Sequence, residues 1–301
     1  MKREIALALG GGGAKGNAHI GVLRVLEEAG YTVRAVAGTS AGSIVGALYA
    51  AGYNPLEIEE WVKSVDQRHF FDRSSGDRPS ILGLHGLRTM LESALGERDI
   101  RSFSIPFGAV SVDILSGKTI FMTSGSAVEA VLASSAVPGI FPPLKKGNWL
   151  LVDGGTTDNV PVRLARLLAP GVPVVAVSLT TMPSVVPCFS GLKPPFQVPG
   201  LLKIAGRLRY TQALKIALRA VDIALSEATL LRLAVDRPEV LITPDVAEID
   251  ILDTDVPVEK VAALGEEAAR HALKDIERLF SPLGRLRRRP PKPELRDVVV
   301  V

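Results

Sequence analysis

Cysteine is nearly absent from this 301-residue chain, and its charges are close to balanced. The single Cys188 excludes an internal disulfide and any zinc or iron–sulfur site built from several cysteines, and it is consistent with a reducing compartment. Lys and Arg number 35 against 32 Asp and Glu, which leaves a net charge of +3. This charge is too small to hold a nucleic-acid backbone unless it is clustered, so no nucleic-acid partner is expected.

Long apolar runs are also missing. Only five apolar residues, Ile5–Leu9, precede the first glycines, whereas the apolar core of a secretion signal needs about 7–15. No stretch approaches the ~18 residues of a membrane-spanning helix. We therefore expect a cytoplasmic protein, for which peripheral contact with the inner membrane surface stays open. The length is near the upper limit for one hydrophobic core, which favours one large domain.

What the chain does contain is a regular alternation of apolar segments. Ile5–Leu9 and Val33–Ala37 are typical of buried strands, and the helical patterns Ala18–Ala29 and Ser43–Ala51 follow them. A strand, a helix and a strand within about 30 residues predict a βαβ unit, and hence a parallel sheet covered by helices. The fold class is therefore α/β.

The remaining elements follow from the same patterns. Strands are predicted at 107–114, 118–122, 149–152, 173–179 and 240–243, the first two as a pair, and helices at 55–65, 87–95, 126–134, 161–168, 201–235 and 258–279. Polar or proline-rich segments at 66–86 and 180–200 are predicted loops. We expect one domain over 1–281 and a basic, proline-rich tail over 282–301 that ends in four valines.

The most informative motif is a G-x-S-x-G sequence, Gly38-Thr39-Ser40-Ala41-Gly42, between a predicted strand and a predicted helix. Glycines on both sides leave room for a sharp turn that exposes the Ser40 hydroxyl. The helix that follows directs its positive end at the place where negative charge develops during acyl transfer. The motif predicts a nucleophilic serine, and the alternative is a glycine- and serine-rich turn without chemistry.

A glycine-rich loop, Gly10–Gly16, follows the first strand and contains G-x-G-x-x-G. A dinucleotide site would need an acidic residue at the end of the second strand, but that strand ends in Ala37-Gly38. A phosphate-binding P-loop is disfavoured because no Gly-Lys-Ser/Thr follows. Successive glycine N–H groups can instead stabilise an oxyanion, and neighbouring parallel strands would place this loop beside Ser40.

The serine also needs a base. His19, His69, His85 and His271 are the only histidines, and each is better explained as a surface or packing residue. Asp153 ends the apolar strand Trp149–Val152 and precedes two glycines, so a partly desolvated carboxylate there could take the serine proton directly. The alternative is an ordinary turn aspartate.

The glycine loop, the G-x-S-x-G motif and Asp153-Gly154-Gly155, in this order, resemble the patatin-like phospholipase family over roughly residues 4–180, and the stretch 133–143 strengthens the resemblance. The resemblance implies a three-layer α/β/α fold with a central, mostly parallel sheet. It implies a Ser-Asp dyad that hydrolyses acyl esters of lipids without metal or cofactor. The expected partner is therefore a lipid or acyl-ester substrate, and the oligomeric state stays open.

Carried over by position, the resemblance implies that Ser40 is the nucleophile and Asp153 the proton acceptor. It implies that the oxyanion hole is formed by the amides of Gly12, Gly13 and Ala14. The residues expected to support these motifs are Gly11, Lys15, Gly16, Gly38, Gly42, Gly154 and Gly155. Lys15 departs from the family, which usually has arginine there, so bidentate fixing of the loop is in doubt.

Three alternatives to a lipid hydrolase remain. The same residues would serve a general carboxylesterase or thioesterase, and the fold could also carry a regulatory protein with little turnover. A nucleotide-binding protein is disfavoured by the missing acidic residue. The basic residues of 201–224 could favour an anionic membrane but are more typical of a core helix with a solvated basic face, and the cluster Arg285–Arg289 is typical of a solvated tail.

Overall fold

The computed structural model describes residues 3–64, 83–180, 209–251, 253, 255–282, 284, 293, 295 and 297–301, and over 209–219 it describes the backbone alone. The strands are β1 (Arg3–Leu9), β2 (Tyr31–Thr39), β3 (Phe107–Asp113), β4 (Lys118–Met122), β5 (Leu144–Lys146), β6 (Trp149–Asp153), β7 (Val174–Val177), β8 (Val240–Ile242) and β9 (Val298–Val300). The α-helices are α1 (Ala18–Glu28), α2 (Ala41–Ala51), α3 (Pro55–Ser64), α4 (His85–Leu95), α5 (Ala127–Ser134), α6 (Val162–Leu168), α8 (Arg209–Asp236) and α9 (Val258–Leu279). Short 3-10 helices include η1 (Gly13–Asn17), η3 (Ile100–Ser102) and η4 (Gly154–Thr156).

These strands form one sheet in the order β5-β6-β3-β2-β1-β7-β8, with β4 on β3 and β9 on β4. The pairs β1–β2, β2–β3, β1–β7, β7–β8 and β4–β9 are parallel, whereas β3–β4, β3–β6 and β5–β6 are antiparallel. The sheet is therefore mostly parallel, as expected, and the antiparallel strands are gathered at one end of it.

Strand β3 has three partners, and their register positions the site. β4 occupies one edge of β3 along 109–113, so β2 and β6 must share the other edge. β2 pairs with this edge as far as Thr39, which lies opposite Val110, and β6 takes over with Asp153 opposite Ser111. The carboxyl ends of β2 and β6 therefore meet on one edge of β3.

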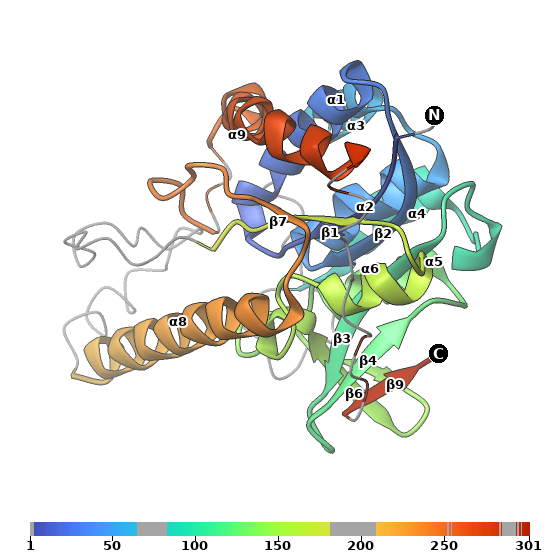
Figure 1. Cartoon of the computed structure of the whole chain (residues 1–301). Helices are drawn as coiled ribbons and strands as arrows, with labels where there is room; N and C mark the ends of the chain where they lie inside the picture. Colours follow the sequence, from blue (N-terminus) through green and yellow to red (C-terminus); the bar gives the residue numbers. More distant parts are fainter. Residues whose placement is uncertain are drawn as a thin grey trace.

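Side chains alternate between the two faces of the sheet and give three layers (Figure 1). One face carries larger residues and is covered by α1–α5 and α9, while α6 and the end of α8 cover the other. In β1 the larger side chains point to the first face and Ala6 and Ala8 to the second. The small alanines let α6 approach the sheet closely, because a short side chain leaves little space between the layers.

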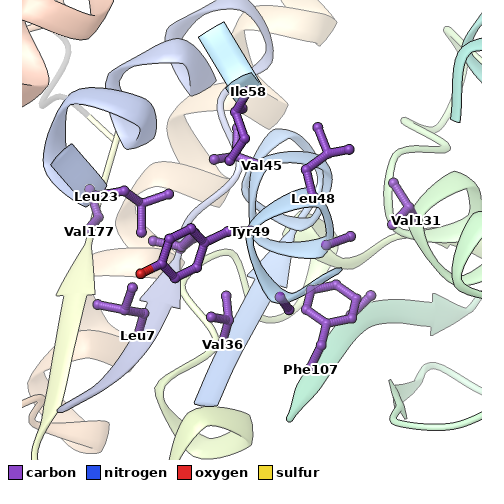
Figure 2. Packing of buried hydrophobic residues seen from close by; sticks show 14 of the residues in the cluster. Leu7, Leu23, Val36, Val45, Leu48, Tyr49, Ile58, Phe107, Val131 and Val177 are labelled. Carbon is purple, nitrogen blue, oxygen red and sulfur yellow. The ribbon is translucent and has the colours of Figure 1, made fainter. Parts of the chain in front are cut away.

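Helix α2, which carries the residues after Ser40, is buried on almost every side. Figure 2 shows its Val45, Leu48 and Tyr49 between the strand residues Leu7, Val36, Phe107 and Val177 and the helix residues Ile58 and Val131. Its sequence is apolar all round, as expected of a helix enclosed between a sheet and other helices. The start of α2, and with it Ser40, is thus held by the main core.

The structure confirms the predicted α/β fold, the βαβ start and the pairing of the strands at 107–114 and 118–122. The expectation of a tail ending in four valines needs a correction, because Val298–Val300 pairs in parallel with β4. Three β-branched residues beside an open strand edge gain backbone hydrogen bonds by adding a strand.

Several predicted features lie wholly or largely outside the described residues. These are Cys188, His69, the cluster Arg285–Arg289, nearly all of the loop 180–200, and the loop 66–86 except for its last residues, of which His85 and Gly86 begin α4. Among the helices that the structure describes, none combines the length and the apolar character needed to cross a membrane.

Candidate active site

Ser40 forms the turn between β2 and α2. Its backbone angles are φ 51° and ψ −125°, in a region that side-chain-bearing residues rarely adopt and that stores about 1–3 kcal/mol of strain. The Ser40 N–H donates to the Ser134 hydroxyl at 2.9 Å, and its carbonyl accepts from the N–H of Ser43 at 2.8 Å and from the Ser43 hydroxyl at 2.6 Å. The strained turn is thus fixed on both sides, and it places the partly exposed Ser40 at the carboxyl end of the sheet.

The two flanking glycines are required by close backbone contacts. A Cβ on Gly42 would lie 2.2 Å from the Leu9 carbonyl oxygen, and one on Gly38 would lie 2.5 Å from the Gly42 carbonyl oxygen. No side chain fits at either position without moving α2 away from β1 and β2. The glycines of the motif therefore allow the helix to begin directly on the sheet.

The glycine loop lies against this turn, as the sequence predicts. A Cβ on Gly11 would lie 3.1 Å from the Ser40 Cβ, and one on Gly16 would lie 2.5 Å from the Ala41 Cβ. The loop is held by the Gly11 N–H, which donates to the Asn159 carbonyl at 3.1 Å. Lys15 lies in η1, which continues the loop into α1, and its side chain is partly exposed.

The three amides expected to form the oxyanion hole are not equivalent. The Ala14 N–H donates to the Ile251 carbonyl at 2.9 Å, in a connection between β8 and α9. The N–H groups of Gly12 and Gly13 make no hydrogen bond within the part of the chain that is described. In this conformation Gly12 and Gly13 are therefore the amides available to an oxyanion.

Asp153 ends β6 and is 5% exposed. Its Oδ1 accepts the Gly155 N–H at 2.7 Å, and its buried Oδ2 accepts no hydrogen bond from the described residues. Burial raises the pKa of Asp153 to about 6, although the nearby Ser40 hydroxyl and the Gly155 amide both lower it. The carboxyl is thus ionised at neutral pH and has an oxygen free to accept a proton.

Gly154 and Gly155 have separate roles in this turn. A Cβ on Gly154 would lie 2.4 Å from the Val110 carbonyl oxygen, so only glycine lets the chain pass β3 directly after Asp153. Gly155 supplies the amide that orients the carboxylate. The structure therefore brings together Ser40, Asp153 and the glycine loop, which are far apart in the sequence.

The described histidines are packing or surface residues, as expected. His19 is fully buried and its Nε2 donates to the Gly10 carbonyl at 2.7 Å, while burial lowers its pKa to about 4. His85 and His271 are exposed. The neutral His19 thus supports the glycine loop from behind, a role that the sequence analysis missed.

Two other supporting residues were missed. Ser134 and Asn159 hold the serine turn and the glycine loop through one hydrogen bond each. Ser134 lies within the stretch 133–143 that carries part of the resemblance, which was the available signal. Their role could not be assigned because their partners are distant in the sequence.

A second buried carboxyl, Asp158, lies close in sequence but belongs to an ion-pair cluster. Its Oδ2 accepts from Arg163 Nη2 at 3.2 Å, and Arg163 Nε lies 3.9 Å from Asp236 in α8. Burial raises the pKa of Asp158 to about 6, opposed by the positive charges of Arg163 and Arg232. This cluster joins α6 to α8.

The side chains of the described residues do not form the ligand set of a metal site. No group of three or more His, Cys, Asp or Glu side chains able to hold a metal ion occurs among these residues.

Comparison with known proteins gives consistent matches. A family model described as Patatin-like phospholipase matches residues 7–166. An uncharacterized NTE family protein of Mycobacterium tuberculosis is 34% identical over 283 residues, which are 90% of this chain and 47% of that protein. The mouse patatin-like phospholipase domain-containing protein 6 is 37% identical over 170 residues, 54% of this chain and 12% of that protein. The chain thus spans about half the length of the Mycobacterium relative and far less of the mouse protein.

A solved structure supports the fold. The crystal structure of VipD from Legionella pneumophila aligns with a TM-score of 0.55 and 15% identity, covering 90% of this chain and 66% of that one. At this identity the likeness concerns the fold alone.

Proposed function

Because the chain belongs to the patatin-like phospholipase family, we propose that it is a serine hydrolase that cleaves acyl esters of lipids, with Ser40 as nucleophile and Asp153 as general base. The observation that carries the proposal is the shared edge of β3, on which the ends of β2 and β6 meet. This register supports a direct contact between a strained serine and a buried carboxyl whose pKa is raised.

The acylation step would begin with attack of Ser40 Oγ on the ester carbonyl carbon. The hydroxyl proton passes to Asp153 Oδ2, which has no other described partner, and the carbonyl becomes an oxyanion. The amides of Gly12 and Gly13 and the positive end of α2 stabilise this oxyanion. Collapse breaks the bond to the leaving alcohol, which takes the proton from Asp153, and leaves an acyl-serine.

The deacylation step repeats this sequence with water. Asp153 removes a proton from the water as it attacks the acyl-serine, and the same amides hold the second oxyanion. Collapse releases the fatty acid and returns the proton to Ser40. Asp153 is therefore ionised at the start of both steps, so its protonation state controls the whole cycle.

A fluorophosphonate probe tests the nucleophile, and ester hydrolysis tests the dyad. Wild type, Ser40→Ala and Asp153→Asn are compared on esters of short and long chains. The proposal expects labelling and turnover in wild type, loss of both in Ser40→Ala, and loss of turnover in Asp153→Asn. A preference for long-chain glycerol esters supports lipid hydrolysis, whereas a short-chain or thioester preference supports the esterase or thioesterase alternative. Folded wild type that neither labels nor turns over would contradict the proposal.

A further inference from the structure

The tips of the β3–β4 and β5–β6 hairpins expose apolar side chains beyond the edge of the sheet where Ser40 and Asp153 lie. Ile114 and Leu115 follow β3 and are 52% and 71% exposed. Trp149 begins β6 beside them, where it packs in part against the main core and stays partly exposed. Large aliphatic side chains at a projecting turn are poorly suited to water, and a neighbouring tryptophan is typical of residues at a membrane interface.

These tips project from the same edge of the sheet as the proposed active site. β3 continues past the end of β2, and β6 runs back along it from Trp149 to Asp153. The tips therefore lie about 13 Å from Asp153, at roughly 3.3 Å per strand residue. In Figure 1 the β3–β4 hairpin extends away from α1, α3 and α9, which cover the other end of the molecule.

A buried carboxylate makes the exposed turn rigid. Asp113, which is 3% exposed, accepts from the N–H groups of Ser116 and Leu150 at 3.2 and 3.0 Å and from the Ser116 hydroxyl at 2.6 Å. The Ile114 N–H also donates to the Leu150 carbonyl at 3.0 Å. The two hairpins are thus tied together, and the apolar side chains are displayed without a large cost of ordering on binding.

Two exposed lysines lie on the same hairpins as the apolar residues. Lys118 and Lys145 are exposed and lie on the two hairpins, while Lys146 pairs with Glu129 at 3.4 Å. The exposed Asp297, whose carbonyl accepts from the Thr119 N–H at 3.1 Å, adds a negative charge near Lys118. Between the hairpins lies an open hollow of about 400 Å³ lined by Leu115, Lys145, Gly147, Asn148, Trp149 and Leu150.

We propose that this hairpin surface, formed by Ile114, Leu115, Lys118, Lys145 and Trp149, docks the protein onto anionic phospholipid membranes. The aliphatic residues enter the interface, and the lysines contact lipid phosphates. Lys145 and Asn148 both line the hollow. The Lys145 ammonium and the Asn148 side-chain amide can donate hydrogen bonds to an anionic headgroup. The contribution of this hairpin surface to catalysis rests on the proposed lipid hydrolysis. Docking would hold the ester bonds of membrane lipids near the edge of the sheet that carries Ser40.

Vesicle co-sedimentation in a Ser40→Ala background tests docking without hydrolysis of the vesicles. The probes are vesicles of phosphatidylcholine alone and of phosphatidylcholine with phosphatidylglycerol. We expect binding to the anionic vesicles only, and an apparent affinity about tenfold lower for Leu115→Ser and for Lys145→Glu. The matched controls are Leu56→Ser in α3, where Leu56 is 59% exposed, and Lys274→Glu in α9, and both should bind as the parent.

Hydrolysis separates this proposal from the proposed function. With Ser40 restored, Leu115→Ser should keep turnover of a soluble short-chain ester and lose about tenfold on anionic vesicles. Leu115-dependent binding without any ester turnover would support the surface while contradicting the hydrolase. Absence of vesicle binding, equal binding to both vesicle types, or equal binding by Leu115→Ser and Leu56→Ser would overturn the membrane surface.

Discussion

Asp153 and Asp158 lie in one short segment, and burial raises the pKa of both to about 6, yet their surroundings differ. Asp158 faces a guanidinium, Arg163, within 3.2 Å, and a second arginine acts on it from α8. Asp153 faces a backbone amide and a serine hydroxyl, and no cation contributes to its pKa. Each carboxyl also has one buried oxygen without a described hydrogen bond.

This difference indicates that a buried carboxyl can have either a structural or a catalytic role. A carboxylate next to arginine is stabilised in its charged form and joins two helices, so its removal strands a buried cation. A carboxylate surrounded only by uncharged hydrogen-bond donors can take up a proton without breaking an ion pair, which suits a general base. The five predictions that follow test this contrast, beginning with the largest expected effect.

Turnover should separate the two aspartates most strongly. Asp153→Asn removes the proposed base and should lower kcat on a soluble ester by about 10⁴-fold or more, as losses of catalytic dyad and triad members do. Asp158→Asn should retain turnover within about fivefold while the protein is folded, because Asp158 does not contact Ser40. Steady-state kinetics measure both, and equal losses would refute the separation of roles.

Stability should depend on the cation beside Asp158. Arg163→Met leaves the buried carboxylates of Asp158 and Asp236 without the cation that they share, so the free energy of unfolding should fall by about 3 kcal/mol. Urea denaturation at pH 7 measures the change. A loss below about 0.5 kcal/mol would mean that the ion-pair cluster does not hold α6 and α8 together.

The pH dependence of turnover should follow Asp153. Its base form is lost as the pH falls through about 6, so kcat/KM on an uncharged ester should fall about tenfold per pH unit below that value. His19 cannot produce this midpoint, because burial lowers its pKa to about 4. Asp158→Asn should leave the midpoint in place, and a shift of more than one unit would contradict independent titration.

Asp153→Asn should make the protein more stable at alkaline pH. The folded pKa of Asp153 lies above its ordinary value of 3.8, so this group favours folding below about pH 4, and that contribution is lost as the pH rises through about 6. Asn removes the buried charge and keeps an oxygen for the Gly155 amide. We expect a gain of about 2 kcal/mol at pH 8 and little change at pH 4. Urea denaturation at both pH values provides the test, and a destabilised variant at pH 8 would count against it.

The smallest effect concerns the serine turn. Ser134→Ala removes the acceptor of the Ser40 N–H and should lower kcat about tenfold and stability by about 1–2 kcal/mol. Ser135→Ala is the matched control, because the buried Ser135 hydroxyl has no described hydrogen bond. Its kinetics and unfolding should stay near those of wild type, so identical losses in the two variants would indicate a general packing effect.

Features of the site that depend on residues close together in the sequence could be predicted, whereas contacts between remote segments could not. The serine turn and the glycine loop were placed correctly, because both follow neighbouring parallel strands, and such strand ends share one edge of the sheet. The capping of the Ala14 amide by Ile251 had no signal, because it depends on a distant segment meeting the loop. The same limit applies to Val298–Val300, whose partner strand is remote in the sequence.

The sequence by itself determined the local geometry of this protein. Gly38, Gly42 and the alternation of strands and helices specify a sharp serine turn on a sheet edge, because these are short-range steric requirements. The tertiary structure decided which acid faces the serine. β6 had to run antiparallel and continue the edge where β2 ends, and arginines had to reach Asp158 but not Asp153. The chemical role of a buried carboxyl depends on the charges near it in space, and these come from distant parts of the chain.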